Sequence, residues 1–152
     1  MINGEPPQLD LDAERRLQRF LVEVIGDGLL LSSHDCAEGG LAVALAECCF
    51  DTGGRGAEVD VPSAGVDHGL IAESTLFGES ASRVVISVEE SRADELLARA
   101  QAGGVPAARI GETGGTRLVI HVDGAAAIDV AILDAEHAWN SAIETHFARR
   151  TA

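Results

Sequence analysis

A glycine-rich segment after the first apolar run carries the side chains best suited to chemistry. It reads Ser33-His34-Asp35-Cys36-Ala37-Glu38-Gly39-Gly40-Leu41. Adjacent glycines let a ligand approach the backbone, and free N–H groups at the start of a following helix favour an anion. Because Asp35 and Glu38 would repel a bare phosphate, such a ligand would also need a bridging Mg²⁺ or an arginine. The predicted ligand-binding residues are Asp35, Glu38, Gly39 and Gly40; the alternative is a capping box with glycines that allow close packing.

A second polar cluster opens a later apolar segment, in residues 76–83. Glu79 and Ser80 can hydrogen-bond the hydroxyl or amide groups of a ligand, and Arg83 can bind an anion through two parallel hydrogen bonds. These three residues complete the predicted ligand-binding set. The alternative is an ion pair between Glu79 and Arg83 that needs no ligand.

Neither a metal site nor a nucleophilic site is indicated by the cysteines and the histidine in this region. The cysteines Cys36, Cys48 and Cys49 form no C-x₂-C pair, and their spacing from His34 is not that of a zinc site. A nucleophilic pair of Cys36 and His34 rests on proximity alone, with no orienting group or oxyanion site. We therefore predict no metal ligand and no catalytic residue.

Composition excludes several classes of protein. The chain has 152 residues and a formal net charge of −14, with 11 Lys+Arg against 25 Asp+Glu. All 11 are arginine, so chemistry that depends on lysine is excluded. The negative charge and 3% aromatic content do not support a nucleic-acid partner, and no apolar run is long enough for a membrane span. Three cysteines without a disulfide framework predict a cytoplasmic protein with reduced thiols.

Periodicity predicts alternating helices and strands that position these clusters. Residues 1–9, with two adjacent prolines, are interpreted as an extended arm or linker remnant, and residues 10–152 as a single α/β domain. The predicted elements are a helix from Asp10 to Gly26, a strand over 29–33, a buried helix over 41–48, strands over 57–61 and 83–88, a helix capped by Ser91 and ended by Gly103, a hairpin of 107–111 with 116–122, and a final helix capped by Asp134 whose Trp139, Ala142, Ile143 and Phe147 face the core. This order predicts a mixed sheet covered by helices.

Two sequence blocks resemble the C-terminal domain of phosphoribosylformylglycinamidine synthase. Residues 34–47, HDCAEGGLAVALAE, are similar to the family's AHDVSDGGLAVALAE, and residues 76–85, LFGESASRVV, are similar to its LFGESQSRVVV. Residues 106–111, residues 128–130 and the final helix also fit. The resemblance covers essentially the whole chain.

The resemblance implies a three-layer α/β/α domain with a mixed sheet, partly ferredoxin-like, as in the C-terminal domain of aminoimidazole ribonucleotide synthase. It implies one part of a ligase of purine biosynthesis that uses ATP, Mg²⁺ and ammonia from glutamine to convert formylglycinamide ribonucleotide to its amidine. Implied partners are the upstream domains of the same enzyme, a glutaminase subunit and a small accessory subunit. Because the family's ATP, Mg²⁺ and general-base residues lie upstream, the fragment is expected to be inactive alone.

Two departures from the family pattern favour a supporting role for this domain. The family contains this domain twice, and this chain resembles the second copy. In the first copy a Glu-Ser-Gln triplet contacts the substrate; the equivalent positions here are Glu79, Ser80 and Ala81, and alanine lacks the amide. Cys36 and Ala37 replace a valine and a serine. Two alternatives remain open: an accessory nucleotide or phosphate site, and a purely structural domain whose apolar faces associate into a homodimer.

Overall fold

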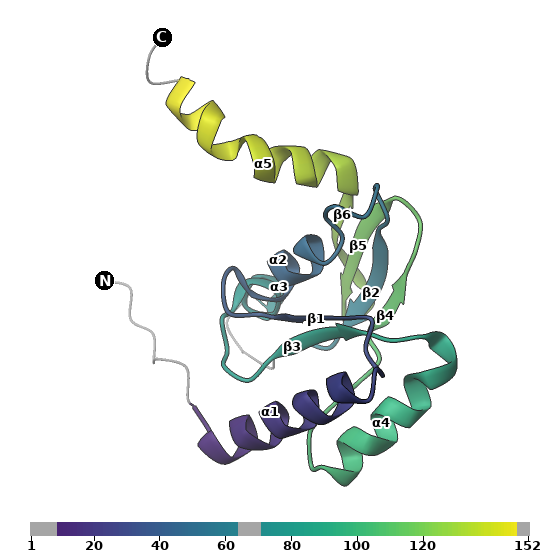
Figure 1. Cartoon of the computed structure of the whole chain (residues 1–152). Helices are drawn as coiled ribbons and strands as arrows, with labels where there is room; N and C mark the ends of the chain where they lie inside the picture. The colour runs from purple at the N-terminus through teal and green to yellow at the C-terminus, as the bar shows by residue number, and fades with distance from the viewer. Residues whose placement is uncertain (1–8, 64–70, 149–152) are drawn as a thin grey trace. The chain divides into compact units, whose positions relative to one another are not determined.

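The computed structural model describes residues 9–63 and 71–148, which form two compact units (Figure 1). The first unit contains residues 1–44 and 76–109, and the second contains residues 45–75 and 110–152. Of the predicted arm, residues 1–8 lie outside the described residues. The elements in chain order are α1 (Leu11–Gly26), β1 (Ser32–Asp35), α2 (Gly40–Glu47), β2 (Ala57–Val61), α3 (Ile71–Phe77), β3 (Val84–Ser87), the 3₁₀ helix η1 (Glu90–Arg92), α4 (Ala93–Ala102), β4 (Gly111–Thr113), β5 (Arg117–Val122), β6 (Ala125–Ala131) and α5 (Ile132–Ala148).

The first unit packs α1 and α4 around a small apolar core. Asp10, where the predicted helix begins, is the cap that precedes α1: its carboxylate accepts hydrogen bonds from the N–H groups of Asp12 and Ala13 at 2.9 and 3.0 Å. Strands β1 and β3 form an antiparallel pair in which Ser32 lies opposite Ser87 and Asp35 opposite Val84. The buried core residues are Phe20, Val24, Leu29, Leu96, Ala100 and Val105.

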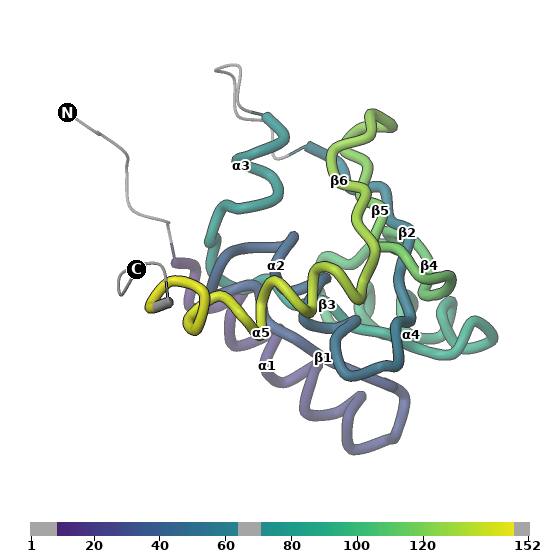
Figure 2. The backbone as a smooth tube through the Cα atoms, turned by 90° about the horizontal axis from the view of Figure 1, so that it is seen from above, coloured from purple at the N-terminus to yellow at the C-terminus, as the bar shows by residue number. Residues whose placement is uncertain are grey.

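The second unit contains a four-stranded mixed sheet in the order β4-β2-β5-β6 (Figure 2). Strands β2 and β5 run parallel, whereas β4 and β6 are antiparallel to their neighbours. In β2 the exposure of the side chains alternates, which confirms the predicted half-buried strand. A mixed sheet together with the helices confirms the predicted α/β class.

The predicted hairpin of residues 107–122 is wrong, because β4 pairs with β2 and β2 lies between β4 and β5. The hairpin that forms instead joins β5 to β6 through Asp123 and Gly124, which have φ angles of 50° and 76°. Two consecutive positive φ values suit the right-handed twist of the two strands, and Asp-Gly is a common sequence at such turns. The sequence therefore carried a hairpin signal that our interpretation missed.

Three predicted element starts are also corrected. Strand β1 begins at Ser32 and includes His34 and Asp35, which were expected beyond its end. The residue before α4 is Arg92, with no side-chain cap, so Ser91 does not cap this helix as predicted. Helix α5 begins at Ile132, which places Asp134 inside the first turn. Glycine, by contrast, ends α4 at Gly103 as predicted.

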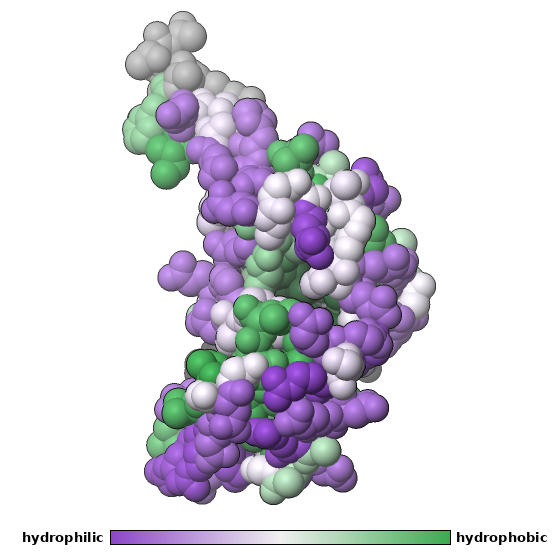
Figure 3. All heavy atoms as spheres, turned by 45° about the vertical axis from the view of Figure 1, so that its right-hand side comes forward, coloured by the Kyte–Doolittle hydropathy of each residue, from purple (hydrophilic) through white to green (hydrophobic). Residues whose placement is uncertain are grey.

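The apolar side of α5 is exposed, although the sequence predicted that it faces the core. Trp139, Ile143 and Phe147 are 54%, 73% and 63% exposed. Figure 3 shows hydrophobic side chains at the upper end of the molecule, where α5 lies. Within the described ranges, neither α5 nor any other helix is long and apolar enough to cross a membrane.

Candidate functional site

The glycine loop connects the end of β1 at Asp35 to the start of α2 at Gly40. Gly39 and Gly40 have φ angles of 77° and 73°, a conformation that costs other residues energy. A Cβ atom on Gly40 would lie 2.7 Å from the carbonyl oxygen of Leu76 and 2.8 Å from the Cα of Phe77. Glycine at this position therefore lets the loop approach the backbone at the end of α3.

The structure brings the two predicted clusters together in the first unit. The N–H group of Gly39 donates a hydrogen bond to Oε1 of Glu79 at 2.9 Å. The N–H group of Cys36 donates to the carbonyl oxygen of Arg83 at 3.1 Å. Two motifs that lie about forty residues apart in the sequence thus form one local structure.

The loop does not fit a bare phosphate. Its Gly39 N–H, a donor that an anion would use, already has a carboxylate acceptor in Glu79. Asp35 and Glu38 are exposed beside it and would repel an anion. Nη1 of Arg83 donates to the carbonyl oxygen of Gly78 at 3.2 Å. Gly39, Glu79 and Arg83 of the predicted ligand-binding set thus have hydrogen-bond partners within the chain. Contact of the seven predicted residues with a ligand stays a prediction.

Between the two structural alternatives for the glycine loop, the geometry favours close packing. Asp35 is the last residue of β1, five positions before the start of α2, and Gly39, which precedes the helix, has no side chain to cap it. The predicted capping box of Asp35 and Glu38 is therefore wrong. The close approach of Gly40 to Leu76 is the interaction that the glycine permits.

A contact from α1 to the second cluster was not expected from the sequence. The hydroxyl of Ser82 donates a hydrogen bond to Oε2 of Glu14, and Nε2 of Gln18 donates to the other carboxylate oxygen at 2.6 Å. These two hydrogen bonds lower the pKa of Glu14 because they stabilise the carboxylate. The glutamate is therefore charged at neutral pH and links α1 to the loop before β3.

The pair of Cys36 and His34 lacks the features of a nucleophilic site. Cys36 is 2% exposed, and its burial raises the pKa of the thiol more than the nearby Arg83 lowers it. Nδ1 of His34 lies 2.6 Å from the carbonyl oxygen of Asp35, so this nitrogen is placed to donate to the backbone. In the described part of the chain, no three His, Cys, Asp or Glu side chains come together as a metal site.

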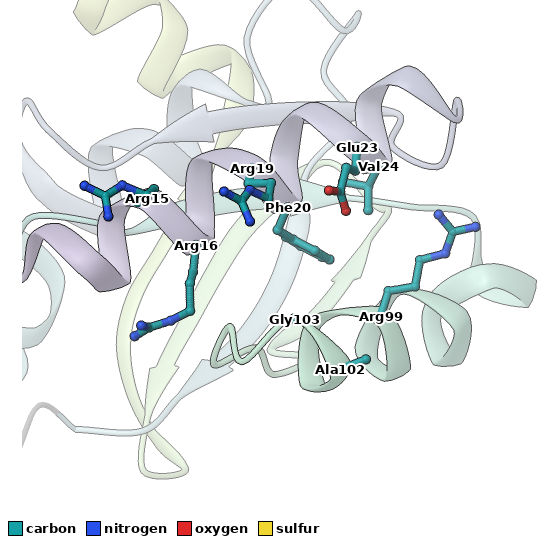
Figure 4. A pocket seen from close by; sticks show the side chains of 9 residues that line it. All are labelled: Arg15, Arg16, Arg19, Phe20, Glu23, Val24, Arg99, Ala102 and Gly103. Atoms are coloured by element: carbon teal, nitrogen blue, oxygen red, sulfur yellow. The ribbon is translucent and has the colours of Figure 1, made fainter.

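A groove between α1 and α4, which we call the arginine groove, was missed by the sequence interpretation. It has a volume of about 540 Å³ and is lined by Arg15, Arg16, Arg19 and Arg99 together with apolar residues (Figure 4). The signal was present in the sequence as three arginines within five positions. Helical spacing of four residues predicts the pairs Asp12–Arg16 and Arg19–Glu23, but in the structure Asp12 pairs with Arg15.

Comparison with known families gives one match that covers most of the chain. The family described as "AIR synthase related protein, C-terminal domain" matches residues 2–123. The phosphoribosylformylglycinamidine synthase subunit PurL of Moorella thermoacetica is 40% identical over 149 residues, which are 98% of this chain and 20% of that protein. The PurL subunit of Methylocella silvestris is 46% identical over 132 residues, which are 87% of this chain and 17% of that protein. The chain thus spans about a fifth of the length of these curated relatives.

Solved structures show a similar fold. The structure described as T. maritima PurL complexed with FGAR superposes with a TM-score of 0.71 and 19% identity, and the match covers 84% of this chain and 21% of that one. The structure described as T. maritima PurL complexed with ATP gives a TM-score of 0.67 at 18% identity, over 78% of this chain and 21% of that one. At this identity the likeness establishes the fold alone.

Proposed function

The chain belongs to the family of the C-terminal domain of AIR synthase related proteins, and we propose that it serves as the C-terminal domain of a phosphoribosylformylglycinamidine synthase. In the proposed reaction, ATP phosphorylates the amide oxygen of formylglycinamide ribonucleotide, and ammonia then displaces that oxygen as phosphate to leave an amidine and ADP. The observation that carries the proposal is the hydrogen bond from Gly39 to Glu79, because it joins the two motifs that resemble this synthase.

The proposed role of this domain is to support a site built largely by other parts of the enzyme. Relatives about five times longer than this chain have room for those parts. The Glu79 carboxylate of the second cluster occupies the N–H donor of Gly39, and the thiol of Cys36 is buried, so neither Gly39 nor Cys36 supplies a reactive group. ATP and Mg²⁺ would be held upstream. Ammonia from a glutaminase subunit, a small accessory subunit and a cytoplasmic location complete the proposal.

Domain replacement tests this function directly. In the PurL subunit of Moorella thermoacetica, the 149 matching residues would be exchanged for this chain. We expect the chimera to form the amidine from formylglycinamide ribonucleotide, ATP and ammonia, because the replacement restores the complete set of domains. The isolated chain is expected to form none. Amidine is measured by chromatography together with phosphate release.

The matched control is the Moorella subunit without the exchanged segment, which we expect to be inactive. A folded chimera that forms no amidine would contradict the proposed function, and amidine formation by the isolated chain would contradict its dependence on other domains.

In the same chimera, Ser80→Ala should leave KM for the ribonucleotide unchanged if the second cluster only supports the site. Loss of a direct hydrogen bond would instead raise KM by about 2- to 10-fold.

The exposed side of α5 is expected to associate when the chain is alone. Trp139, Ile143 and Phe147 recur every four residues and so lie on one side of the helix. A large exposed apolar patch is typical of a surface that another protein surface covers. We propose that the other domains cover it in the complete enzyme and that the isolated chain forms a homodimer through it. Ile143→Glu should weaken this association at least about tenfold, because a charge replaces buried apolar area.

Sedimentation velocity at micromolar concentrations measures this effect. Thr145→Glu adds the same charge on the opposite side of α5 and should leave the dimer unchanged. A monomeric wild-type chain, or equal loss of association in both variants, would show that this side of the helix does not drive association.

A further inference from the structure

Positive charge is concentrated in the arginine groove of a strongly acidic chain. Four of the 11 arginines line the groove, whereas the chain as a whole has a net charge of −14. Figure 4 shows Phe20 extending from α1 toward α4, Arg16 extending downward from α1, and Arg99 extending upward from α4. Glu23 adds one negative charge to the lining. Four like charges repel one another unless something compensates them, so the partners of each arginine decide what the groove can bind.

Two of these arginines are not held by a close side-chain contact among residues 9–63 and 71–148, although the pKa of the Asp10 carboxyl, which backbone hydrogen bonds lower most, is lowered further by the charge of Arg16 nearby. Neither Arg16 nor Arg19 forms an ion pair or a side-chain hydrogen bond there, and both side chains are exposed. Arg15 forms one ion pair with Asp12 at 3.2 Å, but its side chain is 70% exposed and keeps most of its donors free. Three guanidinium groups on α1 can therefore donate to an added anion.

Arg99 has a different role, because it is already compensated. Its Nη1 lies 2.5 Å from Asp27, and its Nη2 lies 2.7 Å from Glu95. These two carboxylates fix the guanidinium in place and balance its charge. The compensated Arg99 forms one wall of the groove, whereas the available charge is on the α1 side.

Apolar atoms form the rest of the groove. Phe20 and Val24 are 7% and 1% exposed and belong to the core, and Ala102 adds a methyl group. Cδ of Arg16 would lie 3.7 Å from a Cβ atom on Gly104, so the arginine stem passes close to the end of α4. The volume of about 540 Å³ falls within the range of about 300–1,000 Å³ that is common for small-molecule sites.

We propose that the arginine groove binds a small ligand that carries a phosphate or pyrophosphate group. Guanidinium groups bind phosphate oxygens through paired hydrogen bonds, which makes arginine better suited to this contact than a point charge. A protein partner would need a surface of about 800 Å² on each side, whereas this groove is a compact hollow between two helices. None of the seven predicted ligand-binding residues lines the groove, so the proposed ligand site is additional to the proposed function.

Calorimetry on the whole chain tests the proposal with inorganic pyrophosphate, in low salt and with a chelator present so that no metal bridges the ligand. We expect saturable binding. The double variant Arg16→Gln with Arg19→Gln should weaken it at least about tenfold, since it removes two charge-assisted contacts. Both residues are exposed and glutamine is a good helix former, so the fold should persist. Circular dichroism verifies that it does.

The matched control is Arg55→Gln, which removes an exposed arginine from the other unit and should change the affinity by less than about twofold. Absence of saturable binding at millimolar pyrophosphate would overturn the proposal, as would an equal loss of affinity in the control.

Other ligands identify the source of the charge. Tighter binding of a polyglutamate peptide would also overturn the proposal and indicate an acidic protein partner. ADP that binds more tightly than pyrophosphate supports a nucleotide source of the phosphate, and equal affinity supports an inorganic source. Because binding is measured directly, the result does not depend on amidine formation.

Discussion

Gly40→Ala is expected to destabilise the chain by about 2–5 kcal/mol. The positive φ angle of 73° costs a residue with a side chain about 1–2 kcal/mol. The added methyl group would also lie 2.7 Å from the carbonyl oxygen of Leu76 and 2.8 Å from the Cα of Phe77, and such overpacking costs about 1–3 kcal/mol. Because both atoms belong to the backbone, no side-chain rotation relieves the contact. Urea denaturation followed by circular dichroism measures the change in unfolding free energy.

Gly28→Ala is the matched control, since it isolates the backbone strain in the same unit. Gly28 has a similar φ angle of 63°, but a Cβ atom there would meet nothing within 4 Å. Its cost should therefore be only about 1–2 kcal/mol. Equal destabilisation by the two substitutions would mean that the loop does not pack against the end of α3. A larger effect at Gly40 would support the interpretation that the motif glycine serves this close approach.

Local patterns of the sequence predicted most elements because the signals are local. The helical pattern over residues 10–26 predicted α1 to within one residue, since Asp10 caps the helix that begins at Leu11. Residues 57–61 alternate between apolar and charged side chains, and the structure places the apolar ones inside. The order of helices and strands was enough to predict an α/β fold with a mixed sheet.

Pairing between distant strands could not be predicted in the same way. Residues 107–111 and 116–122 are close in sequence and were expected to form a hairpin, but β4 pairs with β2, which lies between β4 and β5. Each strand would satisfy its backbone hydrogen bonds with either neighbour, so local propensity does not decide between the two arrangements. The choice depends on contacts with residues more than fifty positions away.

The sequence also shows which side of a helix is apolar without showing what covers it. The stripe at Trp139 and Ile143 was expected in the core, yet both side chains are exposed. Arg16 and Arg19 are exposed charges on α1, and the sequence does not show that they line a groove. Their location beside Phe20 and Ala102 follows from the packing of α1 against α4, which no pattern within α1 predicts.

The candidate site was predicted as two separate clusters, and the structure supplied the connection. Sequence reasoning offered Arg83 as the partner of Glu79, but the carboxylate accepts a hydrogen bond from the backbone of Gly39. This bond forms across forty residues and involves a main-chain group, which no side-chain pattern in the sequence reveals. Because of this bond, the loop lacks a free N–H donor at Gly39, although its sequence resembles an anion site.

Gly56→Ala is expected to have the largest effect in the second unit, at least about 4 kcal/mol, which is in the extreme range for single substitutions. A Cβ atom on Gly56 would lie 1.9 Å from the carbonyl oxygen of Arg117 and 2.5 Å from its carbonyl carbon. Gly56 directly precedes β2, whose Ala57 is opposite Leu118 of β5. The strands would have to separate at this point, which would expose buried apolar residues of both strands. The change in unfolding free energy measures the effect, or the soluble yield if the variant does not fold.

Gly114→Ala is the control for this substitution, because a Cβ atom there meets nothing within 4 Å and its N–H group can still donate to Gly56. A stable, soluble Gly56→Ala chain would contradict the close backbone approach of β2 to β5.

The substitutions at Gly40 and Gly56 also test whether residues 10–152 unfold as the single domain that we propose, since these two glycines belong to different units. In a single cooperative domain, either substitution lowers the midpoint of one shared transition, because neither unit persists without the other. Two transitions that respond separately, one to each substitution, would instead show that the units unfold independently.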